Sequence, residues 1–301
     1  MDAVTGAFSY SGAAIAAGLT VRGRSVRTLT NHPRAGSGYD IRPLDLGDPA
    51  GLRKSLEGVE CLYNTYWVRF PHGDVTFETA VEGSATLFRA AAEAGVRRIV
   101  HVSITAADVN SPYAYFRGKG RVEAHLKESG VPYGIVRPAI LFGGDGVLIN
   151  NIAWLMRRSP VTLIGGGGRY RVRGIHIDDL ATLMADLGER DDSVTVDAVG
   201  PESLTFADLL EHIRASIGSH TRLLPVPGSV FPAVTWLLGR LVRDTLLTRE
   251  EYRAMAAGLA DSDAPATGTI RLTDWITEHR DTLGTAYAHE IRRHFLPQRA
   301  G

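Results

Sequence analysis

The sequence predicts an α/β protein built on a doubly wound parallel sheet and completed by a smaller, mostly helical C-terminal region. Three observations predict this class. Short apolar runs alternate with helical patterns through the first half, a glycine-rich turn follows the first apolar run, and the rhythm changes after about residue 140. Strands that alternate with helices of this length indicate βαβ units, and such sheets bind ligands at the carboxyl ends of their strands.

Each element of the first half follows from its local pattern. Asp48 is the expected N-cap of one helix, and Gly95 and Gly130 are expected to close two others. The predicted strands are 3–4, 25–30, 41–46, 59–63, 98–103 and 133–137. The predicted helices are 11–19, 49–56, 75–94 and 115–129.

The second half has a different pattern. The four glycines at 165–168 are expected to form a turn rather than a phosphate loop, because a polar strand follows them instead of a helix. Asp178 is expected to cap a helix that ends at Leu187, and Thr205 a helix that ends at Ile217. The other predicted elements are a helix at 150–158, strands at 170–174 and 194–199, and a mostly helical remainder at 225–295.

Composition narrows the class of protein. The 301 residues are 44% hydrophobic, which is enough for a sizeable core, and 33 basic residues balance 33 acidic ones. This balance argues against a nucleic-acid partner, which would require a basic excess. Cys61 is the only cysteine, so no disulfide forms within the chain. No signal peptide opens the chain, and residues 230–238 are too short to span a bilayer. We expect a cytoplasmic protein without a transmembrane segment.

The stretch Val4–Gly12, VTGAFSYSG, resembles a dinucleotide-binding turn. Gly6 and Gly12 occupy the outer positions of G-x-x-G-x-x-G, and Ser9 replaces the middle glycine. The turn ends the first strand and opens the first helix, where backbone N–H groups and the helix dipole favour a pyrophosphate. A serine hydroxyl can itself donate to a phosphate oxygen. We therefore expect an NAD(P)-binding domain of the Rossmann type.

The residues after the second strand favour NADP(H) over NAD(H). A carboxylate there would bind the ribose 2′-hydroxyl of NAD, but no acidic residue occurs between Val26 and Tyr39. His32 and Arg34 can instead meet a 2′-phosphate. Asp45 can bond the adenine amino group or cap the next turn. The residues expected around the adenosine half are Asn31, His32, Arg34, Asp45 and Leu46.

Tyr115 and Lys119 are the expected catalytic pair. They lie four residues apart at the start of a helix, which places them on one face. A lysine charge near a phenol lowers the pKa of the tyrosine, which can then exchange a proton with a carbonyl or alcohol while hydride moves to or from nicotinamide. Only three of the 33 basic residues are lysines, so arginine is the usual cation here. Ser103, at the end of the fifth strand, can polarise the same oxygen, with Thr105 as a competitor.

Several segments together resemble the short-chain dehydrogenase/reductase superfamily, in its extended or atypical branch. The chain looks most like the NAD(P)-binding group that includes an accessory subunit of respiratory complex I, NmrA-like proteins and epimerase-like proteins. The matching segments are VTGAFSYSG (4–12), LYNTYW (62–67), RRIVHVSIT (97–105), YFRGK (115–119), VRPAILFG (136–143) and GIHIDDLA (174–181).

The resemblance implies a role for each matching residue. Ser103, Tyr115 and Lys119 match the catalytic triad, with Lys119 also binding the nicotinamide ribose. The backbone of Phe8, Ser9 and Tyr10 would meet the pyrophosphate, Asn64, Thr65 and Tyr66 would line the adenine-ribose side, and Pro138 the nicotinamide side. Residues 1–145 would form the NAD(P)-binding domain, with 170–200 returning to its sheet. Residues 146–169 and 201–301 would form the smaller substrate or lid region.

Three functions remain open at this point. The first is an NADP-dependent oxidoreductase of a small carbonyl or alcohol, acting as a monomer or homodimer. The second is a non-catalytic NAD(P)-binding sensor or accessory subunit, and the third is a nucleotide-sugar epimerase or dehydratase with the same triad. The candidate lining residues of a substrate pocket are Trp154, Phe231, Trp236 and Tyr252. His176 and its neighbours Asp178 and Asp179 do not make a metal set, so no metal is expected.

Overall fold

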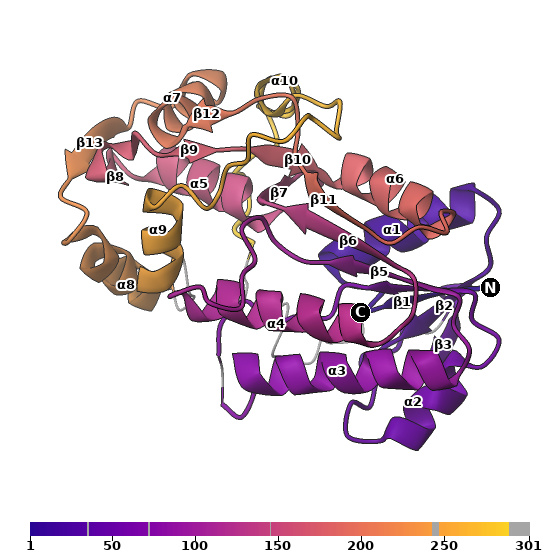
Figure 1. Ribbon diagram of the computed structural model, residues 1–301. Helices are drawn as coiled ribbons and strands as arrows, with labels where there is room; N and C mark the ends of the chain where they lie inside the picture. Colours follow the sequence, from indigo (N-terminus) through magenta and orange to yellow (C-terminus); the bar gives the residue numbers. More distant parts are fainter. Residues whose placement is uncertain (35, 72, 145, 243–246, 289–301) are drawn as a thin grey trace. The chain divides into compact units, whose positions relative to one another are not determined.

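The chain divides into two compact units. The computed structural model describes residues 1–301 except 35, 72, 145, 243–246 and 289–301 (Figure 1). The first unit, called the sheet unit, comprises Met1–Pro138 and Ile177–Ala198. The second, called the C-terminal unit, comprises Ala139–His176 and Val199–Gly301. Each unit has its own hydrophobic core.

A seven-stranded parallel sheet forms the centre of the sheet unit, which confirms the predicted α/β class. In spatial order its strands are β11 (Val194–Ala198), β6 (Tyr133–Pro138), β5 (Arg98–Val102), β4 (Cys61–Asn64), β1 (Asp2–Thr5), β2 (Val26–Leu29) and β3 (Asp40–Arg42). Thr5 pairs with Leu29, and Asn64 pairs with His101. The carboxyl ends of these strands therefore meet at one edge of the sheet, where parallel α/β sheets bind ligands.

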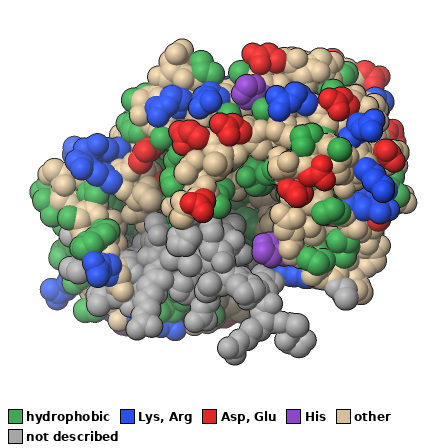
Figure 2. Space-filling view, turned by 90° about the horizontal axis from the view of Figure 1, so that it is seen from below, with side chains coloured by type: hydrophobic (Ala, Val, Ile, Leu, Met, Phe, Trp, Pro, Cys, Tyr) green, Lys and Arg blue, Asp and Glu red, His purple; other side chains and the backbone are tan. Residues whose placement is uncertain are grey.

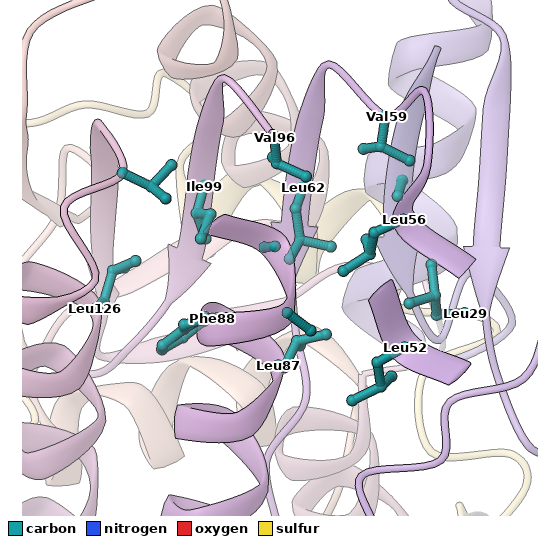
Figure 3. Packing of buried hydrophobic residues seen from close by; sticks show 14 of the residues in the cluster. Leu29, Leu52, Leu56, Val59, Leu62, Leu87, Phe88, Val96, Ile99 and Leu126 are labelled. Carbon is teal, nitrogen blue, oxygen red and sulfur yellow. The ribbon is translucent and has the colours of Figure 1, made fainter. Parts of the chain in front are cut away.

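Helices cover both faces of this sheet (Figure 1). One face carries α1 (Tyr10–Val21) and α6 (Ile177–Gly188); the other carries α2 (Pro49–Leu56), α3 (Phe77–Glu93) and α4 (Ala114–Glu128). Figure 3 shows the second interface, where Leu62 and Ile99 of the sheet lie against Leu87 and Phe88 of α3. These side chains are fully buried. The burial of this apolar face fixes the position of α4, which carries the expected catalytic pair.

The local predictions in the first half are largely confirmed. The helix at 49–56 has the predicted bounds, and its N-cap Asp48 accepts a hydrogen bond from the backbone of Gly51. Gly95 and Gly130 adopt the left-handed conformation that ends a helix. Two predictions are wrong. The strand expected to reach residue 46 ends at Arg42, before Pro43, which has no N–H for a sheet bond. Helix α6 begins at Ile177, so Asp178 lies in its first turn instead of capping it.

The C-terminal unit contains more strands than the sequence predicts. Its helices are α5 (Val147–Arg158), the short η1 (Gly166–Gly168), α7 (Phe206–Ser216), α8 (Phe231–Val242), α9 (Arg249–Ala256) and α10 (Leu272–Glu278). Its strand pairs are β7 (Ile140–Phe142) with β10 (Gly174–His176), β8 (Val161–Gly165) with β13 (Arg222–Val226), and β9 (Arg171–Val172) with β12 (Leu204–Thr205). Thr205 caps α7 as predicted.

The surface agrees with the balanced composition. Basic and acidic side chains are interspersed on the face that Figure 2 shows. Within the part of the chain that the structure describes, no helix is long and apolar enough to cross a membrane. The apolar stretch around residues 230–238 starts helix α8, in which Trp236 is 62% exposed.

Cys61 is expected to be chemically inert in the folded protein. It lies in β4, is 1% exposed, and burial raises the pKa of its thiol to about 12. Because the thiolate is the reactive form, a water-soluble thiol reagent at pH 8 should label the native protein at least about 100-fold more slowly than the protein unfolded in urea. The single cysteine makes the count unambiguous. Full labelling of the native protein within minutes would contradict this burial.

Candidate functional site

The turn between β1 and α1 has the backbone that a phosphate-binding turn requires. Gly6 has φ +67°, and the Ser9 amide donates to the Gly6 carbonyl at 2.8 Å. A Cβ on Gly12 would lie 2.1 Å from the Gly6 carbonyl oxygen, so only glycine fits. No acidic residue lies in the first turn of α1. The N-terminus of this helix therefore remains favourable to an anion.

Ser9 is the N-cap of α1. Its side-chain oxygen accepts a hydrogen bond from the Gly12 amide at 3.4 Å, and the residue is exposed. The hydroxyl proton is not used in that bond and can be donated to an anion. The serine thus performs a capping role that a glycine could not, and its predicted phosphate contact stays a prediction.

The segment after β2 carries an arginine beside the glycine-rich turn. The Arg34 guanidinium lies 5.3 Å from the ring centroid of Phe8, and the Phe8 ring lies 6.2 Å from that of Tyr39. Asn31 bonds both backbone groups of Leu44, at 2.8 and 3.2 Å. Asn31 therefore joins the segments that follow β2 and β3. In NAD-binding folds, an acidic residue near the end of the second strand binds the ribose.

The three other residues expected near the adenosine make local contacts within the protein: His32, Asp45 and Leu46. His32 is exposed, and its amide donates to the Thr30 hydroxyl. Asp45 accepts a bond from the Gly47 amide at 2.9 Å, which is the turn-capping alternative for this residue. Leu46 is partly buried in the core of the sheet unit.

The carboxyl ends of β1, β4 and β5 are joined by a buried hydrogen-bond network. The Thr5 hydroxyl donates to Asn64 Oδ1 at 3.1 Å and accepts from the Thr65 amide at 2.7 Å. Asn64 Oδ1 also accepts from the Tyr66 amide. The amide orientation of Asn64 is therefore fixed, with its Nδ2 group donating to His101 Nδ1 at 3.0 Å. Tyr66 is half-buried, and burial raises the pKa of its phenol.

His101 is a further residue of this region, which the sequence pattern does not predict, and it lies in strand β5. Because Asn64 donates to Nδ1, the ring proton of neutral His101 resides on Nε2. The ring is fully buried, and its Nε2 makes no hydrogen bond among the described residues. Burial holds the pKa of His101 well below its usual value, with the charge of Lys119 acting in the same direction. The only sequence signal is a histidine within an otherwise apolar strand.

Lys119 is buried at the centre of the site. It is 3% exposed, its Nζ donates to the Val102 carbonyl at 2.8 Å, and Nζ lies 4.7 Å from the ring centroid of Trp67. Desolvation lowers the pKa of Lys119 to about 7, and the negative charge of Glu123 opposes this shift. The ring of Tyr115, one turn earlier in α4, packs edge-on against Trp67 and Phe77. The two expected catalytic residues therefore share a helix face lined with aromatic rings.

The third expected catalytic residue, Ser103, is engaged with a carboxylate. Its hydroxyl donates to Glu123 Oε1 at 2.5 Å, and Arg137 donates to both oxygens of Glu123 at 2.8 and 2.5 Å. Ser103 is 4% exposed and Glu123 is 2% exposed. The competing residue Thr105 is buried, and its amide donates to the carbonyl of Pro138, which ends β6.

The expected pocket residues belong to the C-terminal unit. Phe231 and Tyr252 are buried and pack on each other, with ring centroids 5.0 Å apart. Trp154 contacts Tyr287, and Trp236 is exposed beside Arg240. No group of three or more metal-ligating side chains occurs among the described residues.

Known proteins resemble this chain in sequence. Residues 6–153 match the family described as NAD(P)H-binding. The mitochondrial NADH-ubiquinone oxidoreductase 40 kDa subunit of Neurospora crassa is 25% identical over 210 residues, which are 69% of this chain and 55% of the subunit. The chain thus spans about half the length of this relative.

Solved structures share the fold. The triphenylmethane reductase of Citrobacter sp., complexed with NADP(H), superposes with a TM-score of 0.74 at 19% identity, over 92% of this chain and 99% of that one. An NADPH-dependent quinone oxidoreductase of Escherichia coli, complexed with NADPH, gives a TM-score of 0.75 at 21% identity, with the same coverage. The predicted resemblance to NAD(P)-binding proteins is confirmed by the match of residues 6–153 to the NAD(P)H-binding family, and the solved structures show the same fold.

The two glycines of α1 should respond differently to substitution. Gly12→Ala places a methyl group against the Gly6 carbonyl and should destabilise the protein by about 1 to 3 kcal/mol. Gly18→Ala is the matched control, because its Cβ would meet only Ala181 Cβ at 3.7 Å. It should change stability by less than about 1 kcal/mol, in the stabilising direction. Urea unfolding measures both, and equal effects would contradict the tight turn.

Proposed function

We propose that this chain is an NADP(H)-dependent oxidoreductase that transfers hydride between nicotinamide and a small carbonyl or alcohol, with Tyr115 as acid/base. The observation that carries the proposal is the arrangement on α4. A tyrosine and a buried lysine lie four residues apart. The Lys119 ammonium donates a hydrogen bond to the Val102 carbonyl, which fixes its position. Both residues belong to the family domain at 6–153.

The residues of the sheet unit fit a dinucleotide. Gly6 adopts a positive φ that favours glycine, Gly12 leaves no space for a side chain, and the N-terminus of α1 lacks acidic residues, as a pyrophosphate requires. In this proposal the backbone of Phe8, Ser9 and Tyr10 binds the pyrophosphate. When bound, the nicotinamide supplies or accepts the hydride.

Tyr115 and Lys119 perform the proton chemistry in this proposal. The Lys119 ammonium lies in a desolvated position, where its field on a nearby phenol is stronger than in water. It favours the phenolate and so lowers the barrier to proton exchange between Tyr115 and the substrate oxygen. One N–H of Lys119 binds Val102, which leaves two for ribose hydroxyls. Ser103 polarises the substrate oxygen only if its hydroxyl leaves Glu123.

Arg34 supports the preference for NADP(H). Its guanidinium lies over the Phe8 ring, beside the turn, and the residue that follows the Thr30 position is Asn31 instead of an acid. A guanidinium matches a phosphate in charge and geometry. The remaining proposed nucleotide contacts are His32, Asp45, Leu46, Asn64, Thr65, Tyr66 and Pro138. A cytoplasmic location and a monomeric or homodimeric state belong to the same proposal.

A second candidate function is a nucleotide-binding subunit or sensor without turnover. The relative from Neurospora crassa is named as a subunit of an NADH-ubiquinone oxidoreductase, although the match covers 55% of it. The engagement of Ser103 by Glu123 also favours this candidate, because it takes the third catalytic group away from the substrate oxygen. Turnover distinguishes the two functions.

Nucleotide binding and turnover should separate at Tyr115. The wild-type protein should quench or shift NADPH fluorescence on binding and oxidise NADPH with one member of a carbonyl panel. Tyr115→Phe should keep the nucleotide dissociation constant within about threefold and lower turnover at least 100-fold, because it removes the phenolic hydroxyl that exchanges the proton and keeps the ring. Binding without Tyr115-dependent turnover would favour the subunit or sensor. A nucleotide that copurifies with the protein would favour the epimerase or dehydratase.

Arg34 should discriminate between the two cofactors. Arg34→Gln removes the charge that faces the 2′-phosphate, so the dissociation constant of NADPH should rise about tenfold or more while that of NADH changes less than twofold. Arg53→Gln, at an exposed position of α2, is the control and should leave both constants unchanged. Equal losses for NADPH and NADH would remove Arg34 as the specificity residue.

A further inference from the structure

A buried carboxylate continues the spacing of the proposed catalytic pair. Glu123 lies four residues after Lys119 in α4, as Lys119 lies four residues after Tyr115. This spacing places the three side chains on one helix face. Both Lys119 and Glu123 are buried, at 3% and 2% exposure. A charged pair so far from water requires a structural or functional reason.

The partners of Glu123 are a guanidinium, a hydroxyl group and an ammonium. Arg137 of β6 donates to both carboxylate oxygens, and the Ser103 hydroxyl donates to one of them. Lys127 Nζ lies 3.9 Å from Oε2 and is exposed. Charge-assisted bonds of this kind pair the carboxylate with cations in a buried position. A fixed negative charge therefore lies within the core, one helical turn from Lys119.

The remaining surroundings of Lys119 do not offset its desolvation. The titratable and charged groups near it are Tyr115, Glu123 and Lys127 of α4, His101 of β5 and Arg137 of β6. From α3 the region receives the rings of Phe77 and Phe88. His101 remains neutral, because Asn64 donates to its Nδ1 and its Nε2 already carries the proton. Glu123 is the negative charge in this set that favours the ammonium form of Lys119.

We propose that Glu123 is a positioning residue that favours the ammonium form of Lys119, and that Arg137 limits how strongly it does so. The carboxylate attracts the ammonium along α4, while the guanidinium paired with the carboxylate cancels part of that field. Ser103 orients the carboxylate through its hydroxyl. The charge effect is a property of this chain alone; its value for catalysis rests on the proposed function of Lys119.

The scarcity of lysine makes this proposal directly measurable. The chain has three lysines, Lys54, Lys119 and Lys127, and the other two are exposed. Protein labelled with ¹³C and ¹⁵N in lysine gives three side-chain signals, which Lys54→Arg and Lys127→Arg assign. In the wild type, the Lys119 signal should titrate near pH 7, because burial lowers its pKa to about 7. The two exposed lysines should titrate near 10.

The charge variants should move this titration in opposite directions. Glu123→Gln removes the negative charge and leaves the Arg137 cation, so the Lys119 midpoint should fall by about one pH unit or more. Arg137→Gln removes the opposing cation, so the midpoint should rise by a similar amount. The double variant should lie between the two. Ser103→Ala keeps both charges and should shift the midpoint by less than about half a unit.

Opposite shifts in the two single variants support the proposal, and a double variant between them excludes a general loosening of the core. Shifts in the same direction, or shifts below half a unit in both, overturn it and leave Glu123 with a structural role. If Glu123→Gln does not fold, Arg137→Gln and the double variant still give the sign. The titration needs no nucleotide, so a wild-type protein that fails to bind NADPH would refute the proposed function without affecting this result.

Discussion

The side chain of Asn64 joins the carboxyl ends of three parallel strands, and the site depends on this connection. Its Oδ1 accepts from Thr5 at the end of β1, and its Nδ2 donates to His101 in β5. Backbone hydrogen bonds join neighbouring parallel strands, and side chains add further bonds at their carboxyl ends. The amide of Asn64 provides bonds there, and Thr65 adds two more to Thr5. These bonds therefore fix the start of the glycine-rich turn after β1 and the start of the segment after β4, which contains Trp67.

Two sets of buried polar side chains in the sheet unit are paired across elements that are distant in sequence. The Ser103–Glu123–Arg137 set joins β5, α4 and β6, and the Thr5–Asn64–His101 set joins β1, β4 and β5. Each set is costly if one member is missing, because an unpaired buried polar group loses its hydration without compensation. Lys119 lies in the same region of α4 and has a single protein acceptor. The Lys119 ammonium, which has few hydrogen-bond partners, therefore lies near charged groups such as Glu123 and Arg137 that have several.

The sequence predicted what depends on local chemistry. Asp48, Gly95, Gly130 and the turn at Gly6 and Gly12 act within a few residues of themselves, and their patterns were readable. Glu123 and Arg137 were missed because no local pattern pairs residues fourteen positions apart on a helix and a strand. The position of Ser103 at the end of a strand predicts a role for its hydroxyl but not its partner, because the hydrogen bond to Glu123 depends on tertiary packing. The strands of the C-terminal unit are two to five residues long, too short for a reliable alternation.

The contrast between Arg98 and Lys119 explains why a chain rich in arginine has a lysine at this position. Arg98 is also fully buried, but its guanidinium donates to the carbonyls of Leu187, Asp192 and Tyr133, so the fold uses its donors. Its planar fork needs several acceptors in fixed directions. Among the described residues, the Val102 carbonyl is the one acceptor that Lys119 uses, and the Trp67 ring covers another side. A compact ammonium fits this space, and two of its N–H donors have no partner among the described residues. Donors left over in a buried position agree with the ligand-binding role proposed for Lys119, because a bound ribose could accept from both.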